Sequence, residues 1–403
     1  MTRHELPEND KDGLVLSLSA ESAVTVAGTG LVDVQPYGHG TWRLVPRRNI
    51  VGAARVADLD LVVRPKAPFS SVLFMLGYAS DPGFLPTELD GAADDDLWPA
   101  LGETLARLGE RALRQGVLQG YVTRDESLAV LRGRLRAADQ VARRPGALLP
   151  LEVTYDEYEP DIAENRILLA ALHRMSLVPR IPAPVRARLT HLAGRLDGVT
   201  KIAPGAPLPD WSRSRANVRY EASLRVSEVI LRNVGISTSA GGIAVASFVV
   251  NMATVFEEFL TTALREAFRS IDPLGRTVAQ DRDWLDEASR VEIKPDIIHR
   301  SGGEIVAVVD AKYKLVGSEG AYPNVDVYQM LAYCVAHRQT LGWLVYAGQS
   351  GASGQFHDVR NGAVRIAQAP VEVSLESNKL LSQVGALAAA ILNRSVESFA
   401  AGQ

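Results

Sequence analysis

Residues 291–314 constrain the fold of this chain more than any other stretch. Two runs rich in β-branched residues flank Ser301-Gly302-Gly303, and glycine provides the positive φ angle that a tight turn needs. The second run, residues 305–309, is apolar at every position, which is typical of a strand buried on both faces. The sequence therefore predicts a β-hairpin whose second strand lies inside a sheet.

Charged side chains follow this apolar run directly. Asp310 and Lys312 are two positions apart, so they point to the same face of the strand. Asp296 precedes Gly302 by six positions and Asp310 follows it by eight, so the hairpin brings the two carboxylates together. Two carboxylates and an ammonium at the end of a buried sheet are costly unless something bridges them. A divalent cation together with a phosphate would be that bridge.

The pattern Pro295-Asp296, then Asp310-Ala311-Lys312, resembles the signature of the PD-(D/E)XK nucleases. The resemblance implies that the two aspartates hold Mg²⁺ and that Lys312 contacts the attacking water or the scissile phosphate. We expect the carbonyl of Ala311 to be a further ligand and Mn²⁺ to substitute for Mg²⁺. The prediction is an Mg²⁺-dependent endodeoxyribonuclease. A surface hairpin with a salt bridge is the alternative interpretation.

A helix is predicted before the hairpin, over residues 252–264. Its apolar side chains form one stripe, and Glu257 lies beside that stripe. PD-(D/E)XK nucleases often carry a glutamate on this helix, so the resemblance implies that Glu257 reaches the metal and takes part in catalysis. A solvated helix glutamate is the alternative.

A second helix is predicted after the hairpin, over residues 326–336. Gln329 and Tyr333 are four positions apart and share a face of this helix. They resemble the QxxxY element of RecB-like nucleases, which borders the metal site and touches DNA. Tyr333 could equally be an aromatic residue of the core. We also expect Tyr313 and Lys314, which follow the lysine of the signature, to contact DNA.

Composition limits the class of protein. The chain has 403 residues, which suggests two or three domains, and its net charge of −4 gives no overall basic signal for nucleic acid. The single cysteine, Cys334, excludes a disulfide framework and a cysteine-based zinc site. No stretch approaches 18 uninterrupted apolar residues, so we expect a cytoplasmic protein with no membrane contact. With DNA as the expected substrate, we expect no small-molecule substrate.

Three domains are predicted, over residues 1–98, 99–235 and 236–403. The first reads as β-rich and partner-binding, with short strands across residues 13–63, including an alternating run at 24–26. The second reads as mainly helical and begins with an amphipathic helix over residues 99–121. The arginines that follow this helix would contact a phosphate backbone, a partner protein or only solvent. The third would be an α/β (α+β overall) restriction-endonuclease-like domain, with helices flanking a mixed central sheet.

Beyond the nuclease signature, the whole chain resembles the McrC family. The N-terminal motifs that carry this likeness are Leu61-Val62-Val63-Arg64-Pro65-Lys66, Phe74-Met75-Leu76-Gly77-Tyr78, Arg132-Gly133-Arg134-Leu135 and Glu164-Asn165-Arg166-Ile167-Leu168. The C-terminal motifs are Phe256-Glu257, the two halves of the nuclease signature and Gln329-Met330-Leu331-Ala332-Tyr333. The order of these motifs is more specific than any one of them.

This resemblance implies a function in antiviral defence. McrC is the nuclease subunit of McrBC-type restriction systems, which cleave modified DNA and use McrB, a hexameric AAA+ GTPase, as partner. The resemblance implies that the N-terminal half stimulates GTP hydrolysis and that the C-terminal half cuts DNA. The sequence has no Gly-x-x-x-x-Gly-Lys-Ser/Thr loop, so the GTPase must be a partner. Two alternatives remain: a stand-alone PD-(D/E)XK nuclease in repair or another defence system, and a non-catalytic activator of a GTPase ring.

Overall fold

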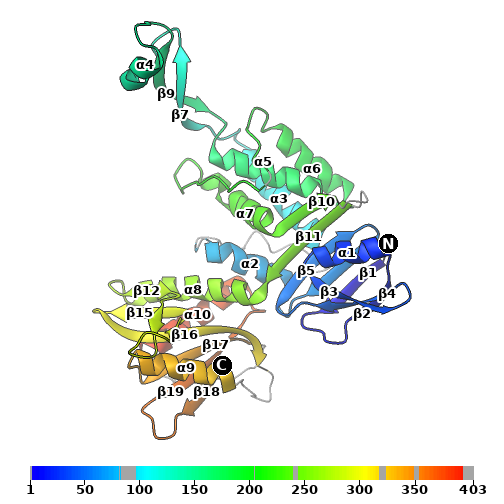
Figure 1. Ribbon diagram of the computed structural model, residues 1–403, viewed down its shortest axis with the longest axis vertical. Helices are drawn as coiled ribbons and strands as arrows, with labels where there is room; N and C mark the ends of the chain where they lie inside the picture. The colour runs from blue at the N-terminus through cyan, green and yellow to red at the C-terminus, as the bar shows by residue number, and fades with distance from the viewer. Residues whose placement is uncertain are drawn as a thin grey trace. The chain divides into compact units, whose positions relative to one another are not determined.

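The chain folds into two compact units in the computed structural model (Figure 1). The structure describes residues 2–80, 82, 97–203, 205–238, 244–316, 324–348 and 354–393. Unit 1 contains Met1–Leu97 and Ser237–Gln403, and unit 2 contains Trp98–Ile236. The chain passes from one unit to the other beside the boundaries predicted near residues 98 and 236, and the first and last predicted domains share unit 1. In the described part of the chain, no helix is long and apolar enough to cross a membrane.

A five-stranded sheet forms the N-terminal part of unit 1. Its strands, in spatial order, are β1 (Thr2–Pro7), β6 (Leu59–Arg64), β5 (Ile50–Val56), β11 (Ala244–Asn251) and β10 (Val234–Thr238). The backbones of β5 and β11 approach closely at Gly52, whose φ is +142°. A Cβ atom at this position would lie 1.8 Å from the carbonyl oxygen of Phe248, so only glycine fits there.

A second, three-stranded sheet has the order β2 (Leu14–Ser17), β4 (Thr41–Pro46) and β3 (Val32–Gly38). The predicted alternation at residues 24–26 is wrong, because these residues lie in helix α1 (Ala20–Gly28). Ser19 caps this helix by accepting a hydrogen bond from the backbone N–H of Ser22. Ala23 and Val26 are buried three positions apart, which is a helical rather than an extended spacing.

Unit 2 contains helices and a projecting sheet. Its helices are α3 (Leu97–Leu113), α4 (Ala137–Arg143), α5 (Ala163–Ser176), α6 (Ala183–Gly194), η1 (Val218–Tyr220) and α7 (Glu221–Asn233). The helix predicted to reach residue 121 ends at Leu113, and Gly116 follows with a φ of +96°. After it, β7 (Gly120–Leu128) pairs with β9 (Leu151–Glu159), which also pairs with β8 (Arg134–Leu135). We call residues 120–159 the arm, which carries α4 near its far tip (Figure 1).

The C-terminal part of unit 1 has a mixed six-stranded sheet flanked by helices, as predicted. Its strands, in spatial order, are β12 (Arg276–Ala279), β15 (Ile297–Ser301), β16 (Glu304–Val316), β17 (Leu341–Gly348), β19 (Arg365–Glu372) and β18 (Gln355–Asp358). β15 and β16 form the predicted antiparallel hairpin, whereas β16, β17 and β19 are parallel. A small separate pair joins β13 (Asp283–Trp284) to β14 (Glu292–Ile293). The hairpin strand β16 is therefore internal to the sheet.

Helices cover this sheet and connect it to the N-terminal part of unit 1. They are α8 (Met252–Ile271), α9 (Asn324–Ala336), α10 (Ser377–Leu392) and the N-terminal α2 (Phe69–Ser80). Met330, Tyr333 and Cys334 of α9 pack in one core with Val308 and Leu344. On α2, Phe74 and Tyr78 make ring contacts with Phe259 of α8. These aromatic contacts explain why the two ends of the chain fold as one unit.

Candidate functional site

The hairpin brings the two predicted carboxylates together. Ile297 pairs with Val309, so the next residues toward the open end of the hairpin, Asp296 and Asp310, lie opposite each other. Asp296 Oδ2 accepts a hydrogen bond of 2.8 Å from the backbone N–H of Ala311. The side chain of Asp310 is almost fully buried, with an exposed fraction of 1% for the residue. The site therefore forms where an internal strand passes from apolar to charged residues.

Burial makes these carboxylates costly to ionise. Burial raises the pKa of Asp310, and the charge of Asp296 raises it further. Burial also raises the pKa of Asp296, with a second contribution from the charge of Glu257. The buried Oδ2 atom of Asp310 lies 2.5 Å from Lys312 Nζ, in an ion pair. Two buried carboxylates beside a single ammonium leave negative charge uncompensated, which fits a bound cation.

Lys312 places a positive charge beside these carboxylates. Its Nζ atom lies 2.5 Å from Asp310 Oδ2 and donates a hydrogen bond of 3.0 Å to Gln329 Oε1. Burial alone would lower the pKa of Lys312, but the charges of Asp310 and Asp296 outweigh burial and the pKa is raised. The side chain is therefore an ammonium, which favours a role in holding negative charge over a role as a base.

Gln329 and Tyr333 fix the direction of Lys312. Gln329 Nε2 donates a hydrogen bond of 2.7 Å to the hydroxyl of Tyr333, which donates one of 3.1 Å to the carbonyl of Lys294. Burial raises the pKa of Tyr333 to about 12, and the hydroxyl stays protonated. Tyr333 is buried and Gln329 is half-buried. Gln329 and Tyr333 lie on the same face of α9, as predicted, and this face is directed toward Lys312.

Glu257 approaches the same group from helix α8. Gln280 Nε2 donates a hydrogen bond to Glu257 Oε1 and a longer one, of 3.4 Å, to Asp296 Oδ1. Burial raises the pKa of Glu257, which the donated hydrogen bond from Gln280 partly offsets. Gln280 was missed by the reasoning from sequence, because a single glutamine after a short strand carries no recognisable signal.

Tyr313 and Lys314 lie apart from this group. Tyr313 is on the opposite face of β16 from Lys312, and its buried hydroxyl donates a hydrogen bond of 2.9 Å to Glu8 Oε2. Lys314 forms an ion pair with Asp326, with nitrogen–oxygen distances of 2.7 and 2.8 Å. The DNA contact expected of Tyr313 therefore has no structural support, and the ammonium of Lys314 is already paired.

The donor set suits a hard cation with few protein ligands. Among the described residues, no three or more His, Cys, Asp or Glu side chains form a group that could hold a metal ion. Asp296 and Asp310 would therefore act as two carboxylate ligands, completed by backbone oxygen and water. Mg²⁺ commonly binds through one or two carboxylates and keeps several waters.

A family model of the McrBC 5-methylcytosine restriction system component matches residues 45–347. This chain belongs to that family. The match begins within β4, covers all of unit 2 and includes Asp296, Asp310 and Lys312. The family membership predicted from the ordered motifs is thus confirmed. A search of curated proteins gave no match.

Solved structures resemble this McrBC-family chain in fold. A chain from the tetradecameric assembly of Thermococcus gammatolerans McrB AAA+ hexamers with bound McrC is 18% identical, with a TM-score of 0.57. That likeness covers 95% of this chain and 99% of the other. A chain of the cryo-EM structure of the T. gammatolerans McrBC complex is also 18% identical, with a TM-score of 0.41 over 66% and 88% of the two chains. The first likeness supports a shared fold along nearly the whole chain.

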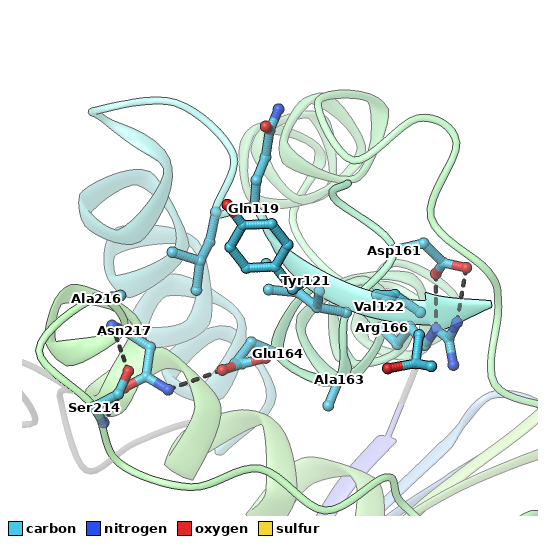
Figure 2. Close-up of a pocket in the computed structure, with 14 residues that line it drawn as sticks. Gln119, Tyr121, Val122, Asp161, Ala163, Glu164, Arg166, Ser214, Ala216 and Asn217 are labelled. Carbon is cyan, nitrogen blue, oxygen red and sulfur yellow. Dashed lines mark hydrogen bonds and ion pairs between the residues drawn. The ribbon is translucent and has the colours of Figure 1, made fainter. Parts of the chain in front are cut away.

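Unit 2 of this McrBC-family chain has a separate cavity of about 520 Å³ (Figure 2). It lies where the arm begins, with Tyr121 of β7 beside residues of helix α5. Arg166 forms two hydrogen bonds with Asp161, at 2.7 and 2.8 Å, and Asn217 Nδ2 donates one of 2.8 Å to Glu164. These polar groups satisfy one another, so their hydrogen bonds stabilise the root of the arm. They leave no evident catalytic group in the cavity.

Proposed function

We propose that this chain is the metal-dependent DNA endonuclease subunit of a GTP-dependent restriction system that acts on modified DNA. The observation that carries the proposal is the cluster of Asp296, Asp310 and Lys312, which a buried hairpin holds beside Gln329. Hydrolysis of a phosphodiester needs groups that bind a cation and offset charge on the phosphate. This cluster supplies both within a family of restriction-system components.

Asp296 and Asp310 would hold Mg²⁺ or Mn²⁺ together with the carbonyl of Ala311 and water, and Glu257 would reach the ion through one of these waters. When bound, the ion would supply Lewis-acid stabilisation of the phosphate and lower the pKa of a nearby water. The protein's own part is to hold both carboxylates close together and away from bulk solvent, where a bound cation would favour their ionised form. The backbone N–H of Ala311 contributes by holding Asp296 Oδ2.

Lys312 would offset charge on the scissile phosphate and orient the attacking water. Its ammonium is held between Asp310 Oδ2 and Gln329 Oε1, so its position is set before DNA binds. The hydroxyl of Tyr333 accepts a hydrogen bond from Gln329, so Tyr333 would act through Gln329 without touching DNA. Such preorganised charge is worth more in a buried site than in water.

The partner would be an AAA+ GTPase, as in the related complex, where McrB AAA+ hexamers are described with bound McrC. The arm supports a protein partner. Its exposed apolar side chains are Tyr121, Val130, Leu131, Leu135, Val141, Leu148, Leu149 and Tyr158. Many of its arginines are already paired with acids, in the ion pairs Arg132–Glu157, Arg136–Asp139, Arg143–Glu152 and Arg144–Glu152. Apolar groups with neutralised arginines suit a protein surface better than a phosphate backbone.

The proposed function is tested with the purified chain, Mg²⁺ and a plasmid in methylated and unmethylated form. Each plasmid is incubated with and without the neighbouring GTPase and GTP. We expect cleavage only when the partner, GTP and modified DNA are all present. Cleavage by the chain alone would support the nuclease activity but contradict its coupling to GTP. Stimulated GTP hydrolysis without any cleavage would contradict the nuclease and favour a non-catalytic activator.

A further inference from the structure

Gln280 occupies an unusual position directly after strand β12. Its φ is +54°, in the left-handed region that non-glycine residues rarely adopt. Its backbone N–H donates a hydrogen bond of 2.9 Å to the carbonyl of Asp296, which ties this turn to the start of strand β15. Such a conformation is strained and persists only where the surroundings fix it. The backbone of Gln280 is thus held in one place beside the carboxylate cluster.

The side chain of Gln280 joins two of the acids. Its amide nitrogen donates to Glu257 Oε1 on helix α8 and to Asp296 Oδ1 before strand β15. A primary amide has two N–H groups, so one neutral side chain can serve both carboxylates. Donors directed at carboxylates favour their charged form and fix the direction of each oxygen. Three segments that are distant in sequence meet through this one amide.

We infer that Gln280 is a positioning residue, which holds Glu257 and Asp296 in the arrangement that accepts a divalent cation. Without the amide, two carboxylates of like charge would turn away from each other, and the cation would have to bring them together again. The inference rests on the proposed function for the identity of that cation as Mg²⁺. It requires no contact between Gln280 and DNA. Groups that orient metal ligands in this way commonly change metal affinity about 10–100-fold when they are replaced.

The test uses two variants of the full chain and a matched control. Gln280→Asn keeps an amide and a residue type that tolerates the left-handed region, but shortens the reach to the two acids. Gln280→Met keeps the length and removes both donors. The control is Gln339→Asn, because Gln339 Nε2 donates to the carbonyl of Ile305 in the same sheet without contacting an acid. Binding of Mg²⁺ to the metal-free proteins is measured by calorimetry, and melting temperatures are measured beside it.

We expect both Gln280 variants to bind Mg²⁺ about 10-fold more weakly, whereas Gln339→Asn binds like the wild type. Unchanged affinity in both Gln280 variants would overturn the inference, as would an equal loss in the control or no Mg²⁺ binding by the wild type. DNA cleavage is measured separately. If Mg²⁺ affinity falls in the Gln280 variants but the wild type never cleaves modified DNA with the partner and GTP, the nuclease proposal fails and the positioning role stands.

Discussion

At the scale of single residues, the candidate site keeps carboxylates of like charge together inside the protein. Burial is the larger cause of the raised pKa values of Asp296 and Asp310, and neighbouring negative charge is the next. A group whose pKa is higher in the folded than in the unfolded state binds protons more tightly when folded. Its favourable contribution is complete below the unfolded pKa, near 4, and is lost as the pH rises through the folded value.

The first prediction follows from this sign. Relative to the wild type, metal-free Asp310→Asn should gain stability as the pH rises, because it removes a carboxyl that ionises only at a cost. We expect the variant to be more stable by about 1 kcal/mol at pH 8 and by less at pH 5. Urea unfolding at the two pH values measures this difference. A stability gain that shrinks as the pH rises would contradict the raised pKa of Asp310.

Some residues of the site could be predicted from sequence and others could not. Asp296, Asp310 and Lys312 follow from local rules, since the turn sets the hairpin register and alternate residues share a strand face. Gln280 joins the site, and Glu8 joins the opposite face of β16, through contacts between segments that are distant in sequence. No local pattern encodes such contacts. The site was therefore predictable along the hairpin but not across the elements that pack against it.

At the scale of elements, strand β16 connects the site to the N-terminal part of unit 1. Lys312 faces helix α9, and the next residue, Tyr313, faces Glu8 at the end of β1. Glu8 is buried, and burial raises its pKa, while the hydrogen bond from Tyr313 acts in the opposite direction. This contact spans 305 positions of the sequence and fixes the face of β16 opposite Lys312.

The second prediction concerns this contact. Tyr313→Phe removes the hydrogen bond that stabilises the ionised form of Glu8, so the variant should lose about 1–3 kcal/mol of stability at pH 8. The loss should be smaller at pH 4.5, where Glu8 is largely protonated and needs the donor less. Tyr37→Phe, at an exposed tyrosine, is the control. An equal loss of stability at both pH values would contradict the role given to Glu8.

Two elements were mispredicted for physical reasons that the structure makes clear. Residues 24–26 alternate in polarity, but the cap at Ser19 and the burial of Ala23 and Val26 stabilise a helix instead. Helix α3 stops at Leu113, and the charged strands β7 and β9 stabilise each other through cross-strand contacts such as Arg124–Glu159. Such strands bury little apolar surface, so the alternation on which strand prediction depends is weak.

At the scale of the whole molecule, the chain separates the candidate chemistry from the candidate partner surface. The carboxylate cluster lies in unit 1, whereas the arm with its exposed apolar side chains belongs to unit 2. This separation predicts that partner stimulation and DNA cleavage can be lost independently. The likeness to the T. gammatolerans chain along nearly the full length supports a shared fold.

The third prediction tests the arm. Val141→Ser combined with Leu148→Ser removes two apolar side chains with exposed fractions of 71% and 85%. Because neither is buried, the melting temperature should not change, whereas GTP hydrolysis by the partner should be stimulated about 10-fold less. Leu274→Ser is the control, since Leu274 is 98% exposed but lies in unit 1. Undiminished stimulation by the double variant would contradict a partner role for the arm.

The most direct test of the central claim compares cleavage of modified plasmid DNA by the wild type and Asp310→Asn, with Mg²⁺, the partner GTPase and GTP. Asp358→Asn serves as control, because Asp358 lies on β18 of the same sheet and forms an exposed ion pair with Arg365. We predict that Asp310→Asn cleaves about 10³-fold more slowly or worse, while it still stimulates GTP hydrolysis and Asp358→Asn behaves like the wild type. Cleavage by Asp310→Asn at the wild-type rate would contradict the assignment of the chemistry to the hairpin.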